Sequence, residues 1–469
     1  MDLNLFLNKN SVSSTVLALL STTFAFSQKQ SKPNILVIMT DQQSAESMSS
    51  VLGNKYLNTP NMDYLAQHGV VFTNAYCANP LSIPSRSSMF TGRYPHEIDI
   101  QTNDFKFIDT KKYPSIGTKF KDSGYETAYF GKWHLPFDLN NPDSHGFDSL
   151  AFNKSNGVDD KLAGSAIEYM KLKSSKPFMM VVSFINPHNI CEWARSNKLP
   201  DGEIGTPPPV NDCPPLRKNA LASTNETDIM RTMRKSYQSN RLFPVGDFDE
   251  TKWREYSWAY YRLIEKVDTE IGKILNSLRD LGLDQNTYIV FMSDHGDCQG
   301  AHQWNQKTVF YEESAKVPLI ISHPGLEVGK SDVLVQTGID FFPSLCDLAE
   351  IDISENIKGI SLKPLLKNEK AKADRIYIVV SNKMVQGEAI NGVKIEPEGR
   401  MLRTGHFKYW IYSEGDQSEI LYDLKNDPGE MVNLASNPKY KSTMDNCRKE
   451  LIKWAKENKD PYLQYLIKK

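Results

Sequence analysis

Four apolar runs of this sequence each lead directly into side chains that can bind a metal ion or an anion. The runs end near residues 39, 130, 184 and 292. The polar residues that follow them are Asp41 and Gln42, Lys132 and His134, His188, and Asp294 and His295. Any one of these could be a helix cap or a solvated charge. Because ligands of open α/β sheets bind beyond the carboxyl ends of the strands, four such runs predict one shared site at a sheet edge.

The oxygen-rich part of this set predicts a site for a hard divalent cation. Asp41, Gln42 and Asp294 offer oxygens and His295 offers an imidazole, which suits calcium or manganese better than a structural zinc. Four further side chains are cationic or can become so: Lys132, His134, His188 and Lys307. A metal ion surrounded by such groups is suited to holding a tetrahedral anion.

A short segment from Leu81 to Gly92 adds a hydroxyl group. Pro84 predicts the start of a short helix and Gly92 its end. Ser82 then lies at the helix entrance, with Arg86 about one turn inside. Serine commonly caps helices, so this segment taken alone favours a purely structural Ser82.

The apolar runs alternate with helical patterns, which indicates the fold class. Pro60 follows Thr59 and starts a predicted short helix that stops at Gly69. A long helix is predicted over Trp253–Leu281, where apolar residues recur at steps of three and four. The expected strands are Asn34–Met39, Tyr125–Phe130, Phe178–Phe184, Tyr288–Met292 and Val317–Ile321. This alternation predicts an α/β fold with a large mixed, mostly parallel sheet sandwiched by helices.

Two regions depart from this alternation. Residues 189–247 are irregular and rich in proline, as in a long functional or disordered loop. Beyond about Lys367 we expect short strands and then a helix near residues 439–456; the strands are Ile376–Val380, Met401–Arg403, Lys408–Tyr412 and Ile420–Leu424. We therefore predict a catalytic domain over residues 28–367 and a smaller C-terminal α+β subdomain over residues 368–469.

Composition excludes several classes of protein. Among 469 residues, 55 Lys and Arg oppose 57 Asp and Glu, so the formal charge of −2 predicts no nucleic-acid-binding surface. Hydrophobic residues make up 40% and charged residues 24%, typical of a folded globular chain. No segment reaches the ~20 apolar residues of a membrane-spanning helix.

The N-terminus has the pattern of a targeting segment. A short apolar run begins at Val16, and Ala25 and Ser27 are small residues at a plausible cleavage site before Gln28. We predict a signal peptide over residues 1–27 and hence a periplasmic or secreted protein; the alternative is an N-terminal tail. The six cysteines form no C-x-x-C pair. Cys191 and Cys213 are either bridged or buried as free thiols.

Taken together, these segments resemble the type I sulfatases of the alkaline-phosphatase-like superfamily. Residues 82–92 match the pattern Ser-x-Pro-Ser-Arg-x-x-x-x-Thr-Gly, at which that family oxidises Cys or Ser to formylglycine. Further matches follow in the family's order at residues 34–41, 59–61, 131–134, 145–148, 187–188, 293–296, 307, 311–314, 421–424 and 427–430. The resemblance covers nearly the whole chain after the leader.

The resemblance implies a role for each candidate residue. Ser82 would become formylglycine (3-oxoalanine), and its hydrate would be the nucleophile and would touch the cation. Arg86 would orient that hydrate. One calcium ion would be bound by Asp41, Gln42, Asp294 and His295. The remaining residues would handle the sulfate and protons: Lys132 and Lys307 hold sulfate oxygens, His134 assists the hydrate and its breakdown, and His188 is the general acid.

This chemistry is physically coherent. A plain serine hydroxyl is a weak nucleophile, whereas a hydrated aldehyde carries two hydroxyls on one carbon. One attacks sulfur while the cation lowers its proton affinity, and the other expels sulfate by collapsing to the aldehyde. The cation, Arg86 and the lysines would compensate charge on the sulfuryl oxygens. A sugar alkoxide is a poor leaving group and needs a proton, which His188 would supply.

With a serine at position 82, the resemblance further implies maturation by a radical enzyme that works without oxygen, and a bacterial source.

The sequence leaves three functions open. The first is a sulfatase acting on a sulfated glycan, either an algal polysaccharide or a glycosaminoglycan oligosaccharide. The second is a phosphonate or phosphate ester hydrolase, because the Asp41, Gln42, Asp294 and His295 set also resembles phosphonate monoester hydrolases and choline sulfatases. The third is a non-catalytic, metal-dependent binding protein.

Candidate sugar contacts are His96, His302 and Trp304.

Overall fold

The computed structural model describes residues 32–153, 158–172, 174–353, 356–367 and 374–468, and from Lys32 onward the described residues form one compact unit. The predicted signal peptide over residues 1–27 lies outside these ranges. Within them, no helix combines the length and apolar character needed to cross a membrane.

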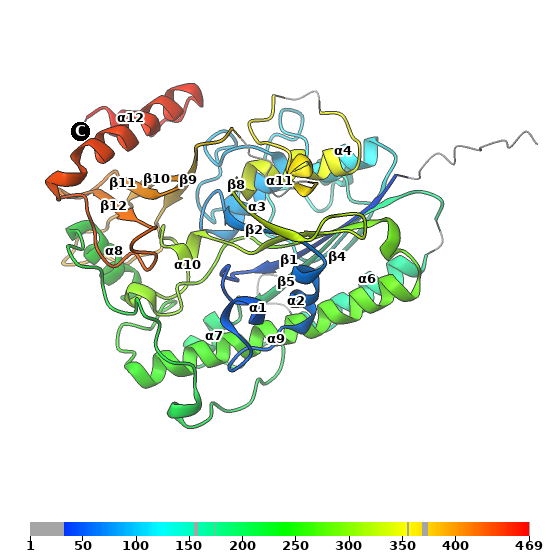
Figure 1. Cartoon of the computed structure of the whole chain (residues 1–469), viewed down its shortest axis with the longest axis horizontal. Coiled ribbons are helices and arrows are strands. Elements are labelled where there is room, and N and C mark those ends of the chain that lie inside the picture. Colours follow the sequence, from blue (N-terminus) through cyan, green and yellow to red (C-terminus); the bar gives the residue numbers. More distant parts are fainter. Residues whose placement is uncertain (1–31, 154–157, 173, 354–355, 368–373, 469) are drawn as a thin grey trace, which may run out of the picture. The chain divides into compact units, whose positions relative to one another are not determined.

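A large sheet of eight strands forms the centre of the molecule (Figure 1). Neighbouring strands are parallel except that β7 runs antiparallel to both β6 and β2. The strands in spatial order are β4 (Ser149–Asn153), β3 (Glu126–Lys132), β5 (Phe178–Pro187), β1 (Asn34–Asp41), β6 (Thr287–Ser293), β7 (Leu319–Ser322), β2 (Gly69–Tyr76) and β8 (Gly329–Gln336). The predicted mixed, mostly parallel sheet is confirmed.

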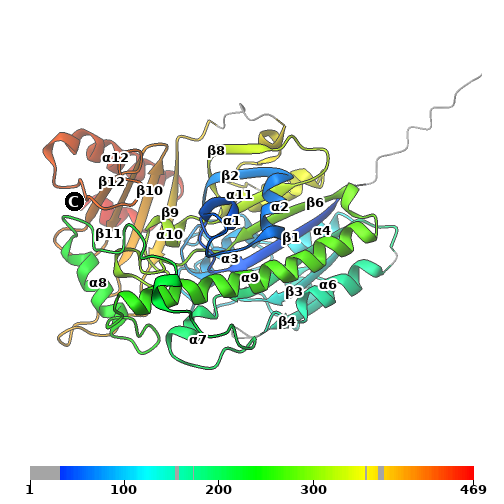
Figure 2. The ribbon, with the colours of Figure 1, turned by 60° about the horizontal axis from the view of Figure 1, so that its bottom comes forward.

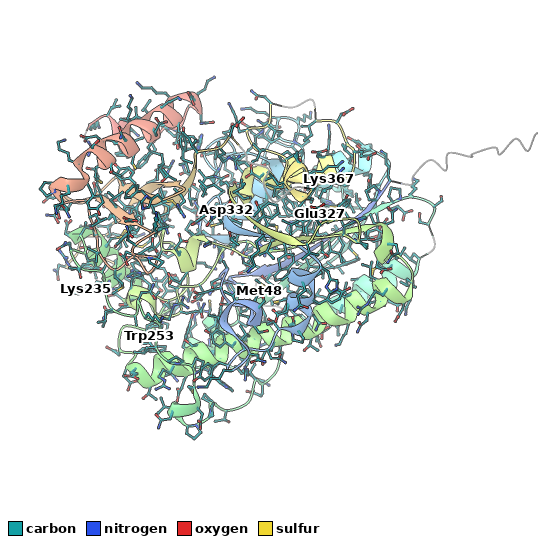
Figure 3. All side chains as sticks on the ribbon, viewed as in Figure 1. Met48, Lys235, Trp253, Glu327, Asp332 and Lys367 are labelled. Atoms are coloured by element: carbon teal, nitrogen blue, oxygen red, sulfur yellow. The ribbon has the colours of Figure 1, made fainter. Side chains whose placement is uncertain are left out.

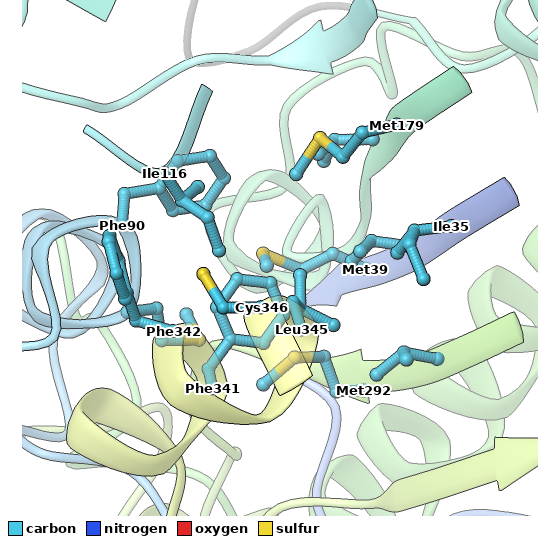
Figure 4. Close-up of a cluster of buried hydrophobic side chains, with 14 of the residues drawn as sticks. Ile35, Met39, Phe90, Ile116, Met179, Met292, Phe341, Phe342, Leu345 and Cys346 are labelled. Atoms are coloured by element: carbon cyan, nitrogen blue, oxygen red, sulfur yellow. The ribbon is translucent and has the colours of Figure 1, made fainter. Parts of the chain in front are cut away.

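Helices cover both faces of this sheet because alternate residues of its strands point to opposite sides. Ile35 and Met39 of β1 pack with Phe90 of α3 (Ser82–Thr91) and Phe341 of α11 (Thr337–Leu348), as Figure 4 shows. Leu36 and Ile38 instead face a second core. That core contains α2 (Pro60–Gln67), α6 (Leu162–Lys171) and α9 (Glu250–Asp280), with α9 lying across this face (Figure 2).

The helix boundaries follow local chemistry. Asp249 caps α9 by accepting a hydrogen bond from the backbone amide of Lys252, and the chain turns at Gly282 with φ of +67°. The side chain of Trp253 marks the beginning of this helix in Figure 3. The helix predicted from residue 253 therefore starts three residues earlier than expected.

A second, four-stranded antiparallel sheet follows in the C-terminal part of the chain. Its strands in spatial order are β12 (Glu419–Asp423), β11 (Phe407–Tyr412), β10 (Glu398–Thr404) and β9 (Tyr377–Lys383). One face packs against α12 (Lys441–Glu457), through residues such as Leu451 and Trp454. This confirms the smaller α+β part. The boundary between residues 367 and 368 stays a prediction, since residues 368–373 lie outside the described ranges.

The other face of the small sheet packs against α8 (Asp228–Gln238) and the segment before α10 (Glu312–Ala315). Lys408 of β11 is fully buried there, and its Nζ lies 2.9 Å from Glu312 Oε1 and 2.8 Å from Glu430 Oε1. The ion pair with Glu312 joins the small sheet to the segment that follows Lys307.

The region over residues 189–247 is less irregular than predicted. It contains α7 (Ile190–Ala194) as well as α8, whose buried Ile229, Met230, Met233 and Tyr237 lie on one side of the helix. The remaining short elements are α1 (Ser49–Leu52), α4 (Ile116–Asp122), α5 (Pro142–His145), α13 (Leu463–Leu466), and 3-10 turns at 210–212, 284–286, 301–303, 363–366 and 438–440.

Candidate active site

The carboxyl ends of β1, β5 and β6 lie side by side at one edge of the large sheet. Asp41 pairs with Pro187 of β5, and Thr40 pairs with Ser293 of β6. The next strand, β3, ends at Lys132 beside β5. The polar residues that follow these strands are therefore brought together, as the sequence predicts.

Ser82 reaches this edge from the first turn of α3. Leu81 occupies the cap position, and the helix start has no side-chain cap, so the capping role considered for Ser82 is wrong. The Ser82 hydroxyl instead lies 3.0 Å from His295 Nε2 and 3.4 Å from Asp41 Oδ2. The side chain of Ser82 has no exposed surface. A hydroxyl buried between a carboxylate and an imidazole is placed for chemistry rather than for helix capping.

Asp41, Asp294 and His295 form a fully buried group whose donor atoms lie within 4.8 Å of one another. Asp41 Oδ1 has no hydrogen-bond partner among the described residues. His295 Nδ1 lies 3.0 Å from the carbonyl oxygen of Gly296, which leaves Nε2 facing the carboxylates. Two carboxylates and one imidazole with an unpartnered oxygen fit a hard divalent cation.

Arg86 holds the two carboxylates from the opposite side. Its Nε donates to Asp294 Oδ2 at 2.7 Å, and its Nη2 donates to Asp41 Oδ2 at 3.1 Å. Nη1 donates to Ser183 Oγ at 2.8 Å, so the guanidinium has partners in several directions. Lys132 Nζ lies 2.5 Å from Asp41 Oδ2. All these side chains are buried, and unpaired charges there would be costly.

Burial and neighbouring charges shift the pKa values of Asp41 and Asp294 in opposite directions. Burial tends to raise the pKa of Asp41, but neighbouring cationic groups, Lys132 first among them, hold it well below its ordinary value. Burial and the charge of Asp41 raise the pKa of Asp294 to about 6. Burial also lowers the pKa of Lys132. The site thus keeps a charged Asp41 beside a carboxyl group that is easier to protonate.

His134 and His188 are partly buried, unlike the other members of the site. Burial and the charge of Lys132 lower the pKa of His134 to about 2. The same two causes, with Lys307, hold the pKa of His188 well below its ordinary value. Both imidazoles are therefore neutral at neutral pH.

Gln42 lies next to this group and has its own hydrogen-bond partners. Its Oε1 accepts a hydrogen bond from Lys307 Nζ at 2.8 Å. Its Nε2 donates to Asp297 Oδ2 at 2.7 Å, and Asp297 also accepts from Tyr256. Asp297 therefore fixes the amide so that its oxygen points to Lys307. Sequence reasoning missed Asp297, although it lies three residues after Asp294.

The predicted sugar contacts lie in the protein interior instead. Trp304 has no exposed surface, and its ring lies 5.5 Å from that of Tyr237. His302 is also fully buried and stacks on Tyr311 at 3.8 Å. Both side chains are thus packed among aromatic residues, and their roles as sugar contacts stay predictions.

His96 has a side chain only 3% exposed. Its Nε2 lies 3.0 Å from the carbonyl oxygen of Asn458, and its ring lies 5.7 Å from that of Trp454, near the end of α12. His96 thus packs against the C-terminal part of the chain. Cys191 and Cys213 are both buried free thiols, so the bridged alternative is not what the structure has.

Comparison with known proteins gives consistent matches over almost the whole chain. The family model described as Sulfatase matches residues 33–351, and the model described as N-sulphoglucosamine sulphohydrolase, C-terminal, matches residues 300–457. The chain is 32% identical over 453 residues to a Delta 4,5-hexuronate-2-O-sulfatase of Bacteroides thetaiotaomicron, covering 93% of this chain and 92% of that protein.

Two further relatives extend this comparison. An ulvan-active sulfatase of Formosa agariphila is 29% identical, with 93% of this chain and 84% of that protein covered. The solved structure of a 2-O GAG sulfatase superimposes with a TM-score of 0.78 at 29% identity, covering 92% of this chain and 93% of that one.

Replacing Arg86 tests whether the guanidinium holds the buried carboxylates. Arg86→Met leaves Asp41 and Asp294 without their shared partner, so we expect the free energy of unfolding to fall by about 3–5 kcal/mol. Urea denaturation at neutral pH with a chelator present measures this change.

Arg279→Met is the matched control, because Arg279 is exposed near the end of α9; its expected change is below about 1 kcal/mol. Equal stability of the two variants would show that Arg86 does not compensate the carboxylates.

Proposed function

Because this chain belongs to the sulfatase family, whose members are sulfuric ester hydrolases, we propose that it removes sulfate from a carbohydrate with Ser82, converted to formylglycine, as its nucleophile. The observation that carries this proposal is the contact of the buried Ser82 hydroxyl with both Asp41 and His295. The named relatives support a sulfated glycan as substrate, either a glycosaminoglycan oligosaccharide or an algal polysaccharide.

A calcium ion fits the group made by Asp41, Asp294 and His295. When bound, such a cation supplies positive charge that stabilises a developing anion and lowers the proton affinity of a nearby oxygen. Gln42 is a fourth candidate ligand, provided that its Oε1 binds the ion while it accepts the hydrogen bond from Lys307. The formylglycine hydrate would supply two hydroxyls on one carbon, so that release of sulfate would need no attacking water.

The other residues of the chain bind the anion and move protons. Lys132 and Lys307 are buried beside the nucleophile and are suited to holding sulfate oxygens. Arg86 keeps Asp41 and Asp294 in place and lies next to the hydrate. His134 is our candidate for assisting the hydrate and its breakdown.

His188 is the candidate general acid for the sugar leaving group. Its pKa is low in the structure because burial and the charges of Lys132 and Lys307 disfavour the imidazolium form. A bound sulfate ester brings a negative charge that offsets the two lysines and raises this pKa. Proton donation is therefore linked to the presence of substrate.

We also propose that the protein is exported, to the periplasm or outside the cell, and that a radical maturating enzyme oxidises Ser82. Export is supported by the pattern of residues 1–27, and radical maturation by the serine in place of cysteine. Export is independent of the hydrolytic activity, whereas the proposed activity requires the oxidation of Ser82.

Ser82→Ala tests the nucleophile. We expect sulfate release from sulfated glucosamine, 2-O-sulfated unsaturated uronate disaccharides or ulvan oligosaccharides to fall by roughly a thousandfold or more, because no hydrate can form. Mass spectrometry of the wild-type peptide that contains Ser82 should show the loss of two hydrogen atoms.

Ser88→Ala is the control, since Ser88 is a buried serine of the same helix whose hydroxyl has no partner among the described residues. Undiminished activity of Ser82→Ala would refute the proposal. Faster turnover of 4-nitrophenyl phosphate than of 4-nitrophenyl sulfate by the wild type would favour the phosphate ester alternative.

His188→Ala tests the general acid. The expected loss is about 10²–10⁴-fold on sugar sulfates, whose alkoxide needs a proton, and much smaller on 4-nitrophenyl sulfate, whose phenolate leaves unaided. His323→Ala, a partly buried histidine stacked on Tyr288, serves as the control. Equal losses on both substrates would exclude proton donation to the leaving group.

Calcium dependence tests the cation site. After treatment with a chelator, calcium at about 100 times its Kd should raise the free energy of unfolding by ~2.7 kcal/mol and restore activity. Asp294→Asn should abolish both effects, whereas Asp122→Asn, an exposed acid at the end of α4, should keep them. Calcium stabilisation that survives Asp294→Asn would place the ion elsewhere.

A further inference from the structure

The segment from Gln101 to Ile108 carries two exposed aromatic rings. The side chains of Phe105 and Phe107 are 58% and 57% exposed. Their ring centroids lie 5.2 Å apart in an edge-to-face arrangement. Among the Phe, Tyr and Trp side chains whose exposure the structure describes, they are the only exposed ones. Single exposed apolar residues are common, but a contacting pair of aromatic rings indicates a binding surface.

Two residues of this segment are hydrogen-bonded to near sequence neighbours of Ser82 and His134. Asn103 Oδ1 accepts a hydrogen bond of 3.0 Å from the backbone amide of Ile83, the residue next to Ser82. At the other end, the amide of Ile108 donates to the carbonyl oxygen of Pro136, two residues after His134, also at 3.0 Å. The two rings therefore lie on a stretch that connects the start of α3 with the exit of β3.

The site itself explains why a second binding surface is useful. Ser82 and Arg86 have no exposed surface and Lys132 is 1% exposed, so the buried group can surround little more than the sulfate. The sugar that carries the sulfate, and any sugar attached to it, must lie outside this buried group, where His134 and His188 are partly exposed. Flat aromatic rings present an apolar face to the C–H groups of a pyranose ring, and they do so at low entropic cost.

We propose that Phe105 and Phe107 form a subsite for a sugar ring next to the sulfated one, so that the preferred substrate is an oligosaccharide rather than a free monosaccharide. This inference rests on the proposed function and adds that the substrate contains more than one sugar ring. A second copy of the chain is a weaker occupant, because two rings cover far less than the ~800 Å² per partner of a stable interface.

The double variant Phe105→Ala/Phe107→Ala tests the subsite. Its kcat/KM is compared with the wild type on glucosamine 6-sulfate, on a 2-O-sulfated unsaturated heparin disaccharide and on the corresponding tetrasaccharide. We expect kcat/KM on the oligosaccharides to fall roughly tenfold through a higher KM, with kcat unchanged. This loss corresponds to ~1.4 kcal/mol of binding free energy. Turnover of the monosaccharide should change by less than about twofold.

Leu172→Ala is the matched control, because Leu172 is 67% exposed and follows α6, before β5 begins. It should leave all three rates and the melting temperature unchanged. Calorimetric titration of the tetrasaccharide into Ser82→Ala, with and without the two phenylalanine substitutions, measures binding without turnover. We expect the Kd to rise about tenfold when the rings are removed.

Three results would overturn the subsite. Equal losses on the monosaccharide and the tetrasaccharide would mean that the segment only positions the catalytic residues. No change on either, with an unchanged Kd, would mean that sugars do not contact the rings. A shift in sedimentation from dimer to monomer with unchanged kinetics would assign the rings to self-association. A wild type that releases no sulfate from any probe would instead refute the proposed function, and the calorimetry would still decide the subsite.

Discussion

The candidate active site depends on balancing two carboxylates that are buried at the same sheet edge. Asp41 and Asp294 have no exposed surface, and each carboxylate would be unstable there without a positive partner. Arg86 contacts both, and Lys132 contacts Asp41. Since these cations occupy one side of the pair, the unpartnered Asp41 oxygen is left for a further cation. The charges that stabilise the fold therefore also prepare the place where an anion is bound.

The topology of the large sheet makes this balance possible. Parallel strands β1, β5 and β6 end together, so residues more than two hundred positions apart in sequence become neighbours. The helix α3 then brings Ser82 and Arg86 to the same edge on a single turn. Most of the site thus comes from the strand ends, and Ser82 and Arg86 come from one helix. A shift of either part would separate the hydroxyl from the carboxylates.

Much of this arrangement can be predicted from the sequence because it follows from strand order. Apolar runs identify the strands, and the polar residues after each run must meet where parallel strands end. Side-chain direction is harder to predict. Gln42 is turned towards Lys307 by Asp297, and His302 and Trp304 are buried by aromatic partners from distant segments. Such contacts have no local signal. The helix α8 was missed because prolines precede it, although its apolar spacing is regular.

The ion pairs of Lys408 connect the small sheet to the part of the chain that carries Lys307, so the two parts depend on each other's sequence. Glu312 follows Lys307 by five residues. Lys408 of the small sheet forms ion pairs with both Glu312 and Glu430. A hybrid chain that takes its C-terminal sheet from a distant relative would retain this joint only if the donor supplies a lysine facing Glu312 and an acid at the place of Glu430. Without them, a buried carboxylate would lose its counter-charge close to the loop that carries Lys307. Exchange of the C-terminal sheet among relatives is therefore restricted by the charges of Lys408, Glu312 and Glu430.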